Sequence, residues 1–298
     1  VKYWGKADAE RMIPSTSSIS LTLENMYTET KLSFLPEDTT GDVMYIDDEL
    51  QGEKETTKAS KVLDLFRTNP NQHVKIETWN NMPTAAGLSS SSSGLSALVK
   101  AANELFQVGK TQSELAQIAK FASGSSSRSF FGPLAAWDKN SGDVYQVETD
   151  LKLAMIMLVL TDQKKPVSSR DGMKLCTETS TSFPEWIKQS EQDYEDMLGY
   201  LKANDFQAVG ELTEANALRM HQTTSTANPP FSYLTDASYQ AMDKVKALRA
   251  SGEQCYFTMD AGPNVKVLCL EEDLDRLAEH FRKDYEVIVS RTKELPDA

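Results

Sequence analysis

The C-terminal part of the sequence contains a run of segments that limits the fold more than any other feature. Two short apolar segments, Cys255–Met259 and Val265–Leu270, have the composition and length of strands, and a tight Ala-Gly-Pro turn lies between them. A helical pattern follows over Leu274–Arg282, and a last strand-like segment over Tyr285–Ser290. This β-turn-β-α-β order predicts an α+β fold with an antiparallel sheet in the second half of the chain.

The remaining segments also alternate between strand and helix patterns. The predicted strands are Lys31–Leu35, Val43–Ile46, Val74–Thr78 and 151–160. The predicted helices are Glu55–Phe66, a helix from Leu95 after Gly94, Ser113–Phe121 with Ser113 as N-cap, two helices within Pro184–Met220 that part near Asn204-Asp205, and Asp236–Ala250. The polar segment 161–183 is the best candidate for a boundary between two halves, 1–160 and 161–298.

Composition narrows the class of protein. The 298 residues include 31 Lys and Arg against 44 Asp and Glu, a formal net charge of −13, which argues against nucleic acids and anionic membranes as partners. The longest apolar run, Leu153–Leu160, is too short to span a membrane. The three cysteines lack the spacing of a disulfide framework or a zinc site, so we expect a reducing, cytoplasmic environment.

Acidic residues are missing from selected stretches of this acidic chain. Neither Thr78–Asn103 nor Leu115–Trp137 contains an Asp or Glu. The first stretch includes the serine-rich segment Pro83–Gly94, between a predicted strand and a strongly amphipathic helix. The N-terminus of a helix offers free N–H groups and a positive dipole end to a phosphate, and glycine allows close approach. An anion site is therefore favoured here over the alternative of a flexible linker.

The second acid-free stretch contains Ser123-Gly124-Ser125-Ser126-Ser127-Arg128-Ser129. An arginine after clustered hydroxyls suits a diphosphate or a carboxylate, because guanidinium binds planar anions through two hydrogen bonds. On this segment alone, an ordinary polar loop is an equally good interpretation.

Asp260 is the candidate for acid–base chemistry. It ends the strand-like segment Cys255–Met259 and begins the Ala-Gly-Pro turn. A carboxylate at the mouth of an anion-binding pocket can act as a general base. The alternative is a turn aspartate that accepts hydrogen bonds from its own backbone.

Together, three distant segments resemble the motifs of the GHMP small-molecule kinase superfamily: Lys2-Tyr3-Trp4-Gly5-Lys6, Pro83–Gly94 and Met259–Asn264. Within it, the K-Y-W-G-K, S-G-S-S-S-R and D-A-G-P-N sequences are similar to those of the diphosphomevalonate decarboxylases. The resemblance runs along nearly the whole chain, including Ser168–Met173. The family has a strand and an Asn-Ile-Ala-type segment before the first motif, so we expect that residues are missing ahead of Val1.

The resemblance implies a GHMP kinase fold with two-layer α/β halves and a deep cleft between them. Residues 1–160 would form an S5-like ATP-binding half, and residues 161–298 a ferredoxin-like half. The implied reaction is the decarboxylation of mevalonate 5-diphosphate to isopentenyl diphosphate, with ATP converted to ADP and phosphate, and CO₂ released. The resemblance also implies Mg²⁺ dependence and a homodimer.

The resemblance also assigns roles to residues. Asp260 would be the base that accepts the hydroxyl proton, Lys2 would supply positive charge near it, and Arg128 would bind the substrate carboxylate. The remaining substrate-binding residues would be Tyr3, Lys6, Ser123, Ser125, Arg170 and Met173. ATP would be bound by Gly87, Ser89, Ser90, Ser91, Ser92 and Lys165, with Ser91 helping to place Mg²⁺. Trp4 is expected to pack in the core.

Two other functions fit parts of the pattern. The nearest is a GHMP kinase that stops after phosphorylation, such as a mevalonate 3-kinase, and release of CO₂ separates it from a decarboxylase. The other is a non-catalytic anion-binding protein with the same fold. The presence of Lys2, Arg128 and Asp260 together argues against that protein, because only catalysis has a use for a base and its cations.

Overall fold

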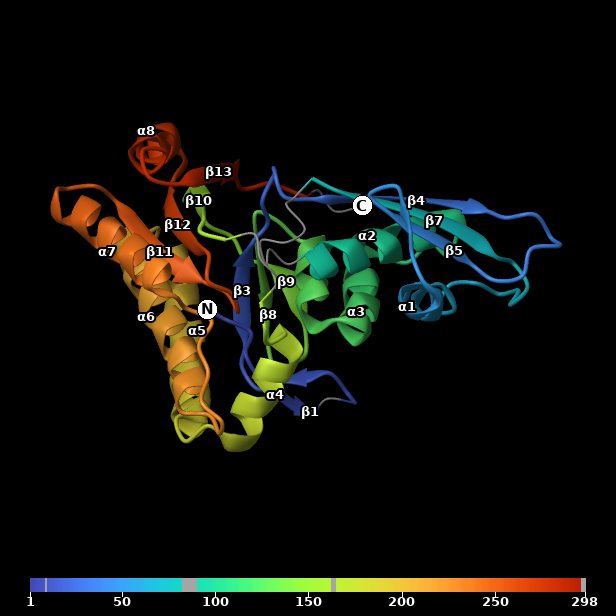
Figure 1. The fold of residues 1–298 in the computed structure, drawn as a ribbon, viewed down its shortest axis with the longest axis horizontal. Helices are drawn as coiled ribbons and strands as arrows, with labels where there is room; N and C mark the ends of the chain where they lie inside the picture. The colour runs from blue at the N-terminus through green and yellow to red at the C-terminus, as the bar shows by residue number, and fades with distance from the viewer. Residues whose placement is uncertain (9, 82–89, 162–164, 296–298) are drawn as a thin grey trace. The chain divides into compact units, whose positions relative to one another are not determined.

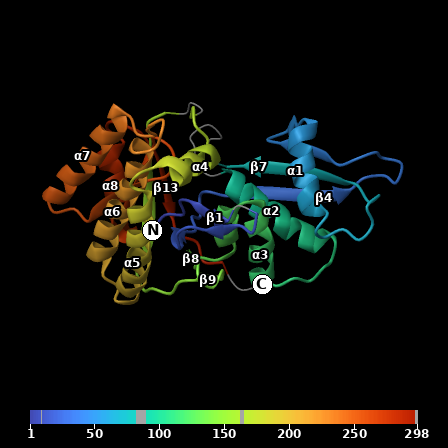
Figure 2. The same cartoon turned by 90° about the horizontal axis from the view of Figure 1, so that it is seen from below.

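The computed structural model describes residues 1–8, 10–81, 90–161 and 165–295, without the side chains of residues 90 and 91. The chain groups into two compact units (Figures 1 and 2). The first unit consists chiefly of Val1–Asn25 and Phe131–Leu295, and the second lies between Met26 and Phe130. Both units combine helices with sheets, which confirms the predicted α+β class. The division at residues 160 and 161 stays a prediction.

The first unit is built on an antiparallel sheet with the strand order β11-β12-β10-β13. Its core face carries Ile156, Phe257 and Val267, which pair across three strands and pack against two helices, α7 and α8 (Figure 1). The bounds are β10 (Leu153–Val159), β11 (Cys255–Met259), β12 (Val265–Leu270), β13 (Glu286–Arg291), α7 (Asp236–Ala250) and α8 (Leu274–Phe281). The predicted β-turn-β-α-β run is confirmed.

Three more helices of this unit build a second hydrophobic cluster, which includes the buried side chains of Trp4, Trp186 and Met220. They are α4 (Ser169–Thr179), α5 (Phe183–Lys202) and α6 (Phe206–Ser225). The predicted break between α5 and α6 is confirmed: the Asp205 side chain caps α6 by accepting a hydrogen bond from the Ala208 amide, 3.0 Å away. The core position expected for Trp4 is also confirmed.

Helix α4 differs from the prediction, which places a polar connection in this segment. Its first turn is capped by Ser168, whose side chain accepts a hydrogen bond from the Asp171 amide. Only one narrow side of the helix is apolar, and there Met173 and Cys176 are buried. The mostly polar composition therefore concealed a helix that burial of one side stabilises.

Short strands complete the first unit, and they too were missed. Strands of two to four residues carry too few alternating positions to be recognised from a pattern. They form a hairpin, β1 (Lys6–Asp8) with β2 (Ile13–Pro14), and the antiparallel sheet β3 (Ser18–Leu21), β8 (Leu134–Trp137) and β9 (Val144–Gln146). A 3₁₀ turn, η2 (Glu271–Asp273), precedes α8.

The second unit contains a sheet with the strand order β4-β7-β5-β6, in which β5 and β7 are parallel. Its strands are β4 (Thr28–Phe34), β5 (Val43–Ile46), β6 (Glu49–Leu50) and β7 (Val74–Asn80). Its helices are α1 (Glu53–Leu63), α2 (Ser90–Leu105), α3 (Gln112–Ala122) and the 3₁₀ helix η1 (Gly124–Phe130). Apart from β6 and η1, these elements were predicted, with bounds that differ by a few residues.

Two predicted helix starts in this unit are wrong. Helix α2 begins at Ser90 rather than after Gly94, so the serines belong to its first turn. Helix α3 is capped by Thr111 and not by Ser113, since Thr111 and Glu114 exchange hydrogen bonds in a capping box. That reciprocal pair satisfies two amide groups at once, which a lone serine cap does not.

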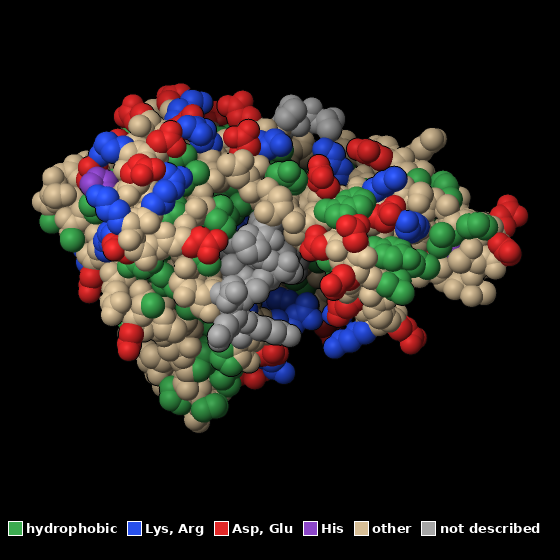
Figure 3. All heavy atoms as spheres, turned by 45° about the horizontal axis from the view of Figure 1, so that its top comes forward, with side chains coloured by type: hydrophobic (Ala, Val, Ile, Leu, Met, Phe, Trp, Pro, Cys, Tyr) green, Lys and Arg blue, Asp and Glu red, His purple; other side chains and the backbone are tan. Residues whose placement is uncertain are grey.

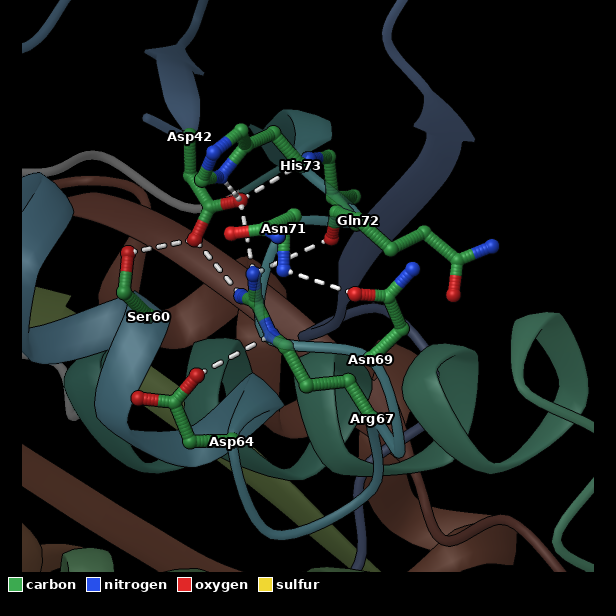
Figure 4. A network of polar contacts seen from close by, with 9 residues as sticks. Asp42, Ser60, Asp64, Arg67, Asn69, Asn71, Gln72 and His73 are labelled. Carbon is green, nitrogen blue, oxygen red and sulfur yellow. Dashed lines mark hydrogen bonds and ion pairs between the residues drawn. The ribbon is translucent and has the colours of Figure 1, made fainter. Parts of the chain in front are cut away.

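A buried ion pair ties three segments of the second unit together (Figure 4). Asp42 precedes β5 and accepts hydrogen bonds from Arg67 Nη2 at 2.6 Å, from the Ser60 hydroxyl at 2.6 Å and from the Val74 amide at 2.8 Å. Burial by itself raises the pKa of Asp42, but these hydrogen bonds outweigh it and leave the pKa below its ordinary value. The network joins β5, α1 and β7.

The surface carries both signs of charge. Figure 3 shows acidic and basic side chains interspersed over one face, without a large region of a single sign. Among the described residues, no helix combines the length and apolar content that crossing a membrane requires. Cys176, Cys255 and Cys269 are buried free thiols.

Candidate functional site

Asp260 lies in the turn of the β11–β12 hairpin, where the strand pairing ends. The turn is held to the end of β10, because the Asn264 side chain accepts hydrogen bonds from the amides of Leu160 and Thr161 at 2.8 and 3.2 Å. The Asp260 side chain is 42% exposed. A carboxylate in this position is fixed by a sheet and still open to a ligand.

Two lysines contact this carboxylate. Lys2 Nζ lies 2.8 Å from Asp260 Oδ1, as the resemblance implied. Lys266, from strand β12, forms an ion pair with the other oxygen, Oδ2. Because both side-chain oxygens contact lysines, the structure does not support the alternative of an aspartate that accepts hydrogen bonds only from the backbone of its own turn. Lys266 was missed, and the available signal was a lysine inside an otherwise apolar strand.

The backbone of Lys2 is held in place by helix α6. The Lys2 amide donates to Asn216 Oδ1 at 2.8 Å, and Asn216 Nδ2 donates to Asp193 Oδ2 at 2.7 Å. Arg219 forms an ion pair with the same buried Asp193. These three polar residues of α5 and α6 were also missed, since nothing in a helical pattern indicates which distant segment a polar group contacts.

A third lysine lies at the same turn. Lys165 Nζ donates to the Ala261 carbonyl and to the Ser169 hydroxyl, both at 2.6 Å. Burial lowers the pKa of Lys165. Burial, followed by repulsion from Lys2 and Lys165, lowers the pKa of Lys266 to about 7. The turn therefore gathers cations from three separate segments, an arrangement that suits a highly charged anion.

Other predicted substrate residues of the first unit lie near one another. Lys6 is in β1, which packs against α4, the helix that carries Arg170. Burial and then the charge of Arg170 lower the pKa of Lys6, so two of the cations assigned to the substrate are neighbours. The ring centroids of Tyr3 and Trp137 lie 5.2 Å apart with the rings tilted by 43°, and Met173 is buried in the hydrophobic cluster that contains Trp4. The substrate roles of Tyr3 and Met173 stay predictions.

The serine-rich segments of the second unit meet each other. Ser92, in the first turn of α2, and Ser125, in η1, have hydroxyls 2.5 Å apart, and Ser123 Oγ lies 3.4 Å from that of Ser125. The first turn of α2 contains no acidic residue. Ser90 and Ser91 belong to this turn by their backbone, whereas Gly87 and Ser89 lie outside the described residues. A hydroxyl cluster thus joins Ser92, in the first turn of α2, to Ser125 of η1 and Ser123, the C-cap of α3, and the binding roles of these serines stay predictions.

Arg128 lies in η1, a segment that is stabilised by one hydrogen bond from α2 and one within η1 itself. The Ser96 hydroxyl donates to the Ser126 carbonyl at 2.9 Å, and the Ser127 hydroxyl donates to the Gly124 carbonyl at 2.8 Å. Arg128 itself is half-buried. The S-G-S-S-S-R run is therefore a packed 3₁₀ helix and not a free polar loop.

Comparison with known proteins agrees with this geometry. Residues 1–147 match the Diphosphomevalonate decarboxylase-like N-terminal domain, and residues 155–296 match the Mevalonate 5-diphosphate decarboxylase C-terminal domain. A curated relative, diphosphomevalonate decarboxylase of Candida albicans, is 30% identical over 96% of this chain and 85% of its own length.

Two solved structures extend the likeness. The mevalonate pyrophosphate decarboxylase from Streptococcus pyogenes is 67% identical, with a TM-score of 0.97 over 100% of this chain and 94% of that one. A structure described as MDDEF in complex with MVAPP, AMPPCP and magnesium is 40% identical, with a TM-score of 0.91 over 99% of this chain and 93% of that one. The implied GHMP kinase fold is thereby confirmed, and this chain belongs to the diphosphomevalonate decarboxylase family.

Proposed function

We propose that this chain catalyses the ATP-dependent decarboxylation of mevalonate 5-diphosphate to isopentenyl diphosphate. The observation that carries the proposal is the Asp260 carboxylate, held at a hairpin turn between the ammonium groups of Lys2 and Lys266. A base flanked by cations is what the phosphorylation of an alcohol by ATP requires. The reaction is the one that names the family. MgATP is proposed as the second substrate, because AMPPCP and magnesium are bound in the related structure of MDDEF.

The first chemical step is phosphorylation of the tertiary hydroxyl at C3. The hydroxyl oxygen forms a bond to the γ-phosphorus, the bond from that phosphorus to ADP breaks, and Asp260 accepts the hydroxyl proton. Lys2 offsets negative charge on the transferring phosphoryl group. Positioning of the two reactants contributes most of the rate, because the protein forms no covalent bond to either.

The second step removes phosphate and CO₂ from the phosphorylated substrate. The C3–oxygen bond breaks with its electron pair on phosphate, which gives C3 carbocation character. The bond between C2 and the carboxylate carbon then breaks, and its electron pair forms the double bond of isopentenyl diphosphate. Arg128 binds the substrate carboxylate through two parallel hydrogen bonds, a geometry that suits a guanidinium group.

The remaining assignments concern binding. The first turn of α2, which lacks acidic residues, supports a phosphate site formed by Ser90, Ser91 and Ser92, with Ser91 placing the magnesium that accompanies ATP. Lys165, Gly87 and Ser89 are the further residues assigned to ATP. The substrate diphosphate and carbon chain are assigned to Tyr3, Lys6, Ser123, Ser125, Arg170 and Met173.

We also propose that the enzyme is a cytoplasmic homodimer whose ATP-binding and ferredoxin-like halves are residues 1–160 and 161–298. Three buried free thiols are compatible with a reducing compartment. Light scattering at several protein concentrations tests the dimer, and a constant monomer mass would contradict it.

The reaction itself is tested by measuring ADP and CO₂ together. The protein is incubated with MgATP and with mevalonate 5-diphosphate, mevalonate 5-phosphate or mevalonate, each labelled in the carboxylate. We expect one CO₂ for each ADP, with the diphosphate as the preferred substrate. Formation of ADP and a stable phosphorylated product without CO₂ would instead identify a kinase that stops after the first step.

A further inference from the structure

Lys266 occupies an unusual place for a lysine. Strand β12 is otherwise apolar, and it lies between β11 and β10, so that Lys266 has neighbours on both sides. Thr258 and Met157 face it across the two ladders, on the side of the sheet opposite the core face of Phe257 and Val267. Its side chain is only 14% exposed. Such a charge needs a partner, because leaving an ammonium group buried and unpaired is costly.

The partner of Lys266 is the catalytic base. The hairpin register puts Thr258 opposite Lys266, and Asp260 follows two residues later, where the turn brings its Oδ2 to the lysine. The contact therefore follows from the strand pairing and needs no movement of a loop. The base and its partner are both held by the same two strands.

Lys2 contacts the other oxygen from a different kind of segment. It precedes the first strand, β1, so its backbone is held by two side chains rather than by a ladder: the Lys2 amide donates to Asn216 Oδ1, and the Thr16 hydroxyl donates to the Lys2 carbonyl. Lys2 is also the cation assigned to the transferring phosphoryl group. When a phosphate competes for Lys2, Asp260 keeps a defined orientation only if the contact to Oδ2 persists.

We propose that Lys266 is a positioning residue for Asp260: its ammonium group holds Oδ2, so that the carboxylate stays aligned with the substrate hydroxyl while Lys2 turns to the phosphoryl group. The inference rests on the proposed function, because it takes Asp260 as the base. Lys266 acts through Asp260 and forms no bond to the substrate.

The charged groups around Lys266 determine how this contact responds to pH. In the described residues these are Lys2 from the opening segment, Lys165 from the segment before α4, and Asp260. The facing residues of β10 and β11 are Met157 and Thr258, which do not titrate. His221 of α6 is neutral, since burial and then Lys2 lower its pKa to about 3. Only the ammonium form of Lys266 holds the carboxylate; burial and the two lysines lower its pKa to about 7, and the attraction of Asp260 acts against that shift.

The sign of the pH effect follows directly. Below the pKa of Lys266 the contact is complete, and it is lost as the pH rises through that value. The rate of phosphoryl transfer at saturating substrate should therefore fall on the alkaline side because of this lysine. An arginine at the same position keeps its charge over the whole range and should remove that decline.

The test compares three variants of the full chain: Lys266→Met, Lys266→Arg and, as a matched control, Lys244→Met. Lys244 forms an ion pair with Asp284, in the same unit and apart from the Asp260 turn. ADP formation is followed from pH 5.5 to 9.5, together with thermal melting. For Lys266→Met we expect kcat to fall by about 10- to 100-fold, KM to change by less than about threefold, and the alkaline decline to vanish.

The variants separate a positioning role from a structural one. We expect Lys266→Arg to recover kcat to within about tenfold of wild type and to remove the alkaline decline, and Lys244→Met to resemble wild type. A kcat for Lys266→Met within twofold of wild type would overturn the inference, as would equal loss in both Lys266 variants with an unchanged pH profile. If the wild type releases ADP without CO₂, the proposed function fails, yet ADP formation still tests Lys266.

Discussion

Asp260 is the residue on which the proposed chemistry depends most directly. Asp260→Asn keeps the size and shape of the side chain but removes the site that accepts a proton. We expect kcat to fall by at least about 10³-fold with a modest change in KM, because the loss concerns the reaction step and not binding. Steady-state ADP formation measures both constants. Turnover close to that of the wild type would contradict the role as base.

A matched control distinguishes this loss from a general effect of removing a charge. Asp243 lies on α7, is largely exposed and pairs with Lys246. Asp243→Asn should leave kcat and the melting temperature unchanged, because an exposed pair of this kind contributes little.

Arg128 tests whether geometry or charge binds the substrate carboxylate. Arg128→Lys keeps the positive charge but replaces a planar fork with a point charge, so we expect kcat/KM to fall by about 10²-fold or more. Progress curves at low substrate concentration measure this ratio. Kinetics equal to the wild type with lysine at this position would exclude the two-bond interaction.

At the scale of elements, the ion pair between Asp42 and Arg67 is the contact whose loss should destabilise the second unit most (Figure 4). Their side chains are only 3% and 5% exposed. Arg67→Met removes one partner and leaves a carboxylate buried without its cation, so we expect a loss of about 3–5 kcal/mol in the free energy of unfolding at pH 7. Urea denaturation measures it.

The pH dependence of that loss is a second, independent readout. The folded-state pKa of Asp42 lies below its ordinary value. The carboxylate therefore contributes stability above about pH 4, and this contribution is lost as the pH falls further. The difference in the free energy of unfolding between Arg67→Met and wild type should become smaller in acid, because a protonated Asp42 needs no cation. An equally large gap at pH 3 would mean that arginine packing, and not charge, is responsible.

Arg276→Met provides the contrast. Arg276 also contacts two carboxylates, Glu253 and Asp273, but it is half exposed and open to solvent. Water screens such pairs, so this variant should unfold at nearly the same urea concentration as the wild type.

For the whole molecule, ligand binding should be separable from catalysis. A ligand that binds only the folded chain stabilises it, by about 2.7 kcal/mol at 100 times its dissociation constant. MgATP and mevalonate 5-diphosphate should therefore raise the melting temperature by several degrees, in Asp260→Asn as in the wild type. Differential scanning calorimetry measures the shift. A shift that disappears in Asp260→Asn would assign Asp260 to binding rather than to proton transfer.

Segments with a clear strand composition or helical pattern were predictable from the sequence. The strands Cys255–Met259 and Val265–Leu270 and the helix Asp236–Ala250 have the predicted bounds, because their apolar side chains are buried against one another at regular spacing. Short strands such as Leu134–Trp137 and the polar helix Ser169–Thr179 were not predictable. Their stability comes from contacts with distant segments, which a local pattern does not record.

The residues of the candidate site also fall into a predictable group and an unpredictable group. Lys2, Arg128 and Asp260 were found from the sequence, because motifs keep functional residues in a recognisable local order. Lys266 and Asn216 were found only in the structure: one contacts Asp260 through the register of a hairpin, and the other contacts Lys2 across 214 positions of the chain. A local sequence determines which residues are chemically able to act. Tertiary folding decides which of them meet, because a contact between distant residues depends on every element packed between them.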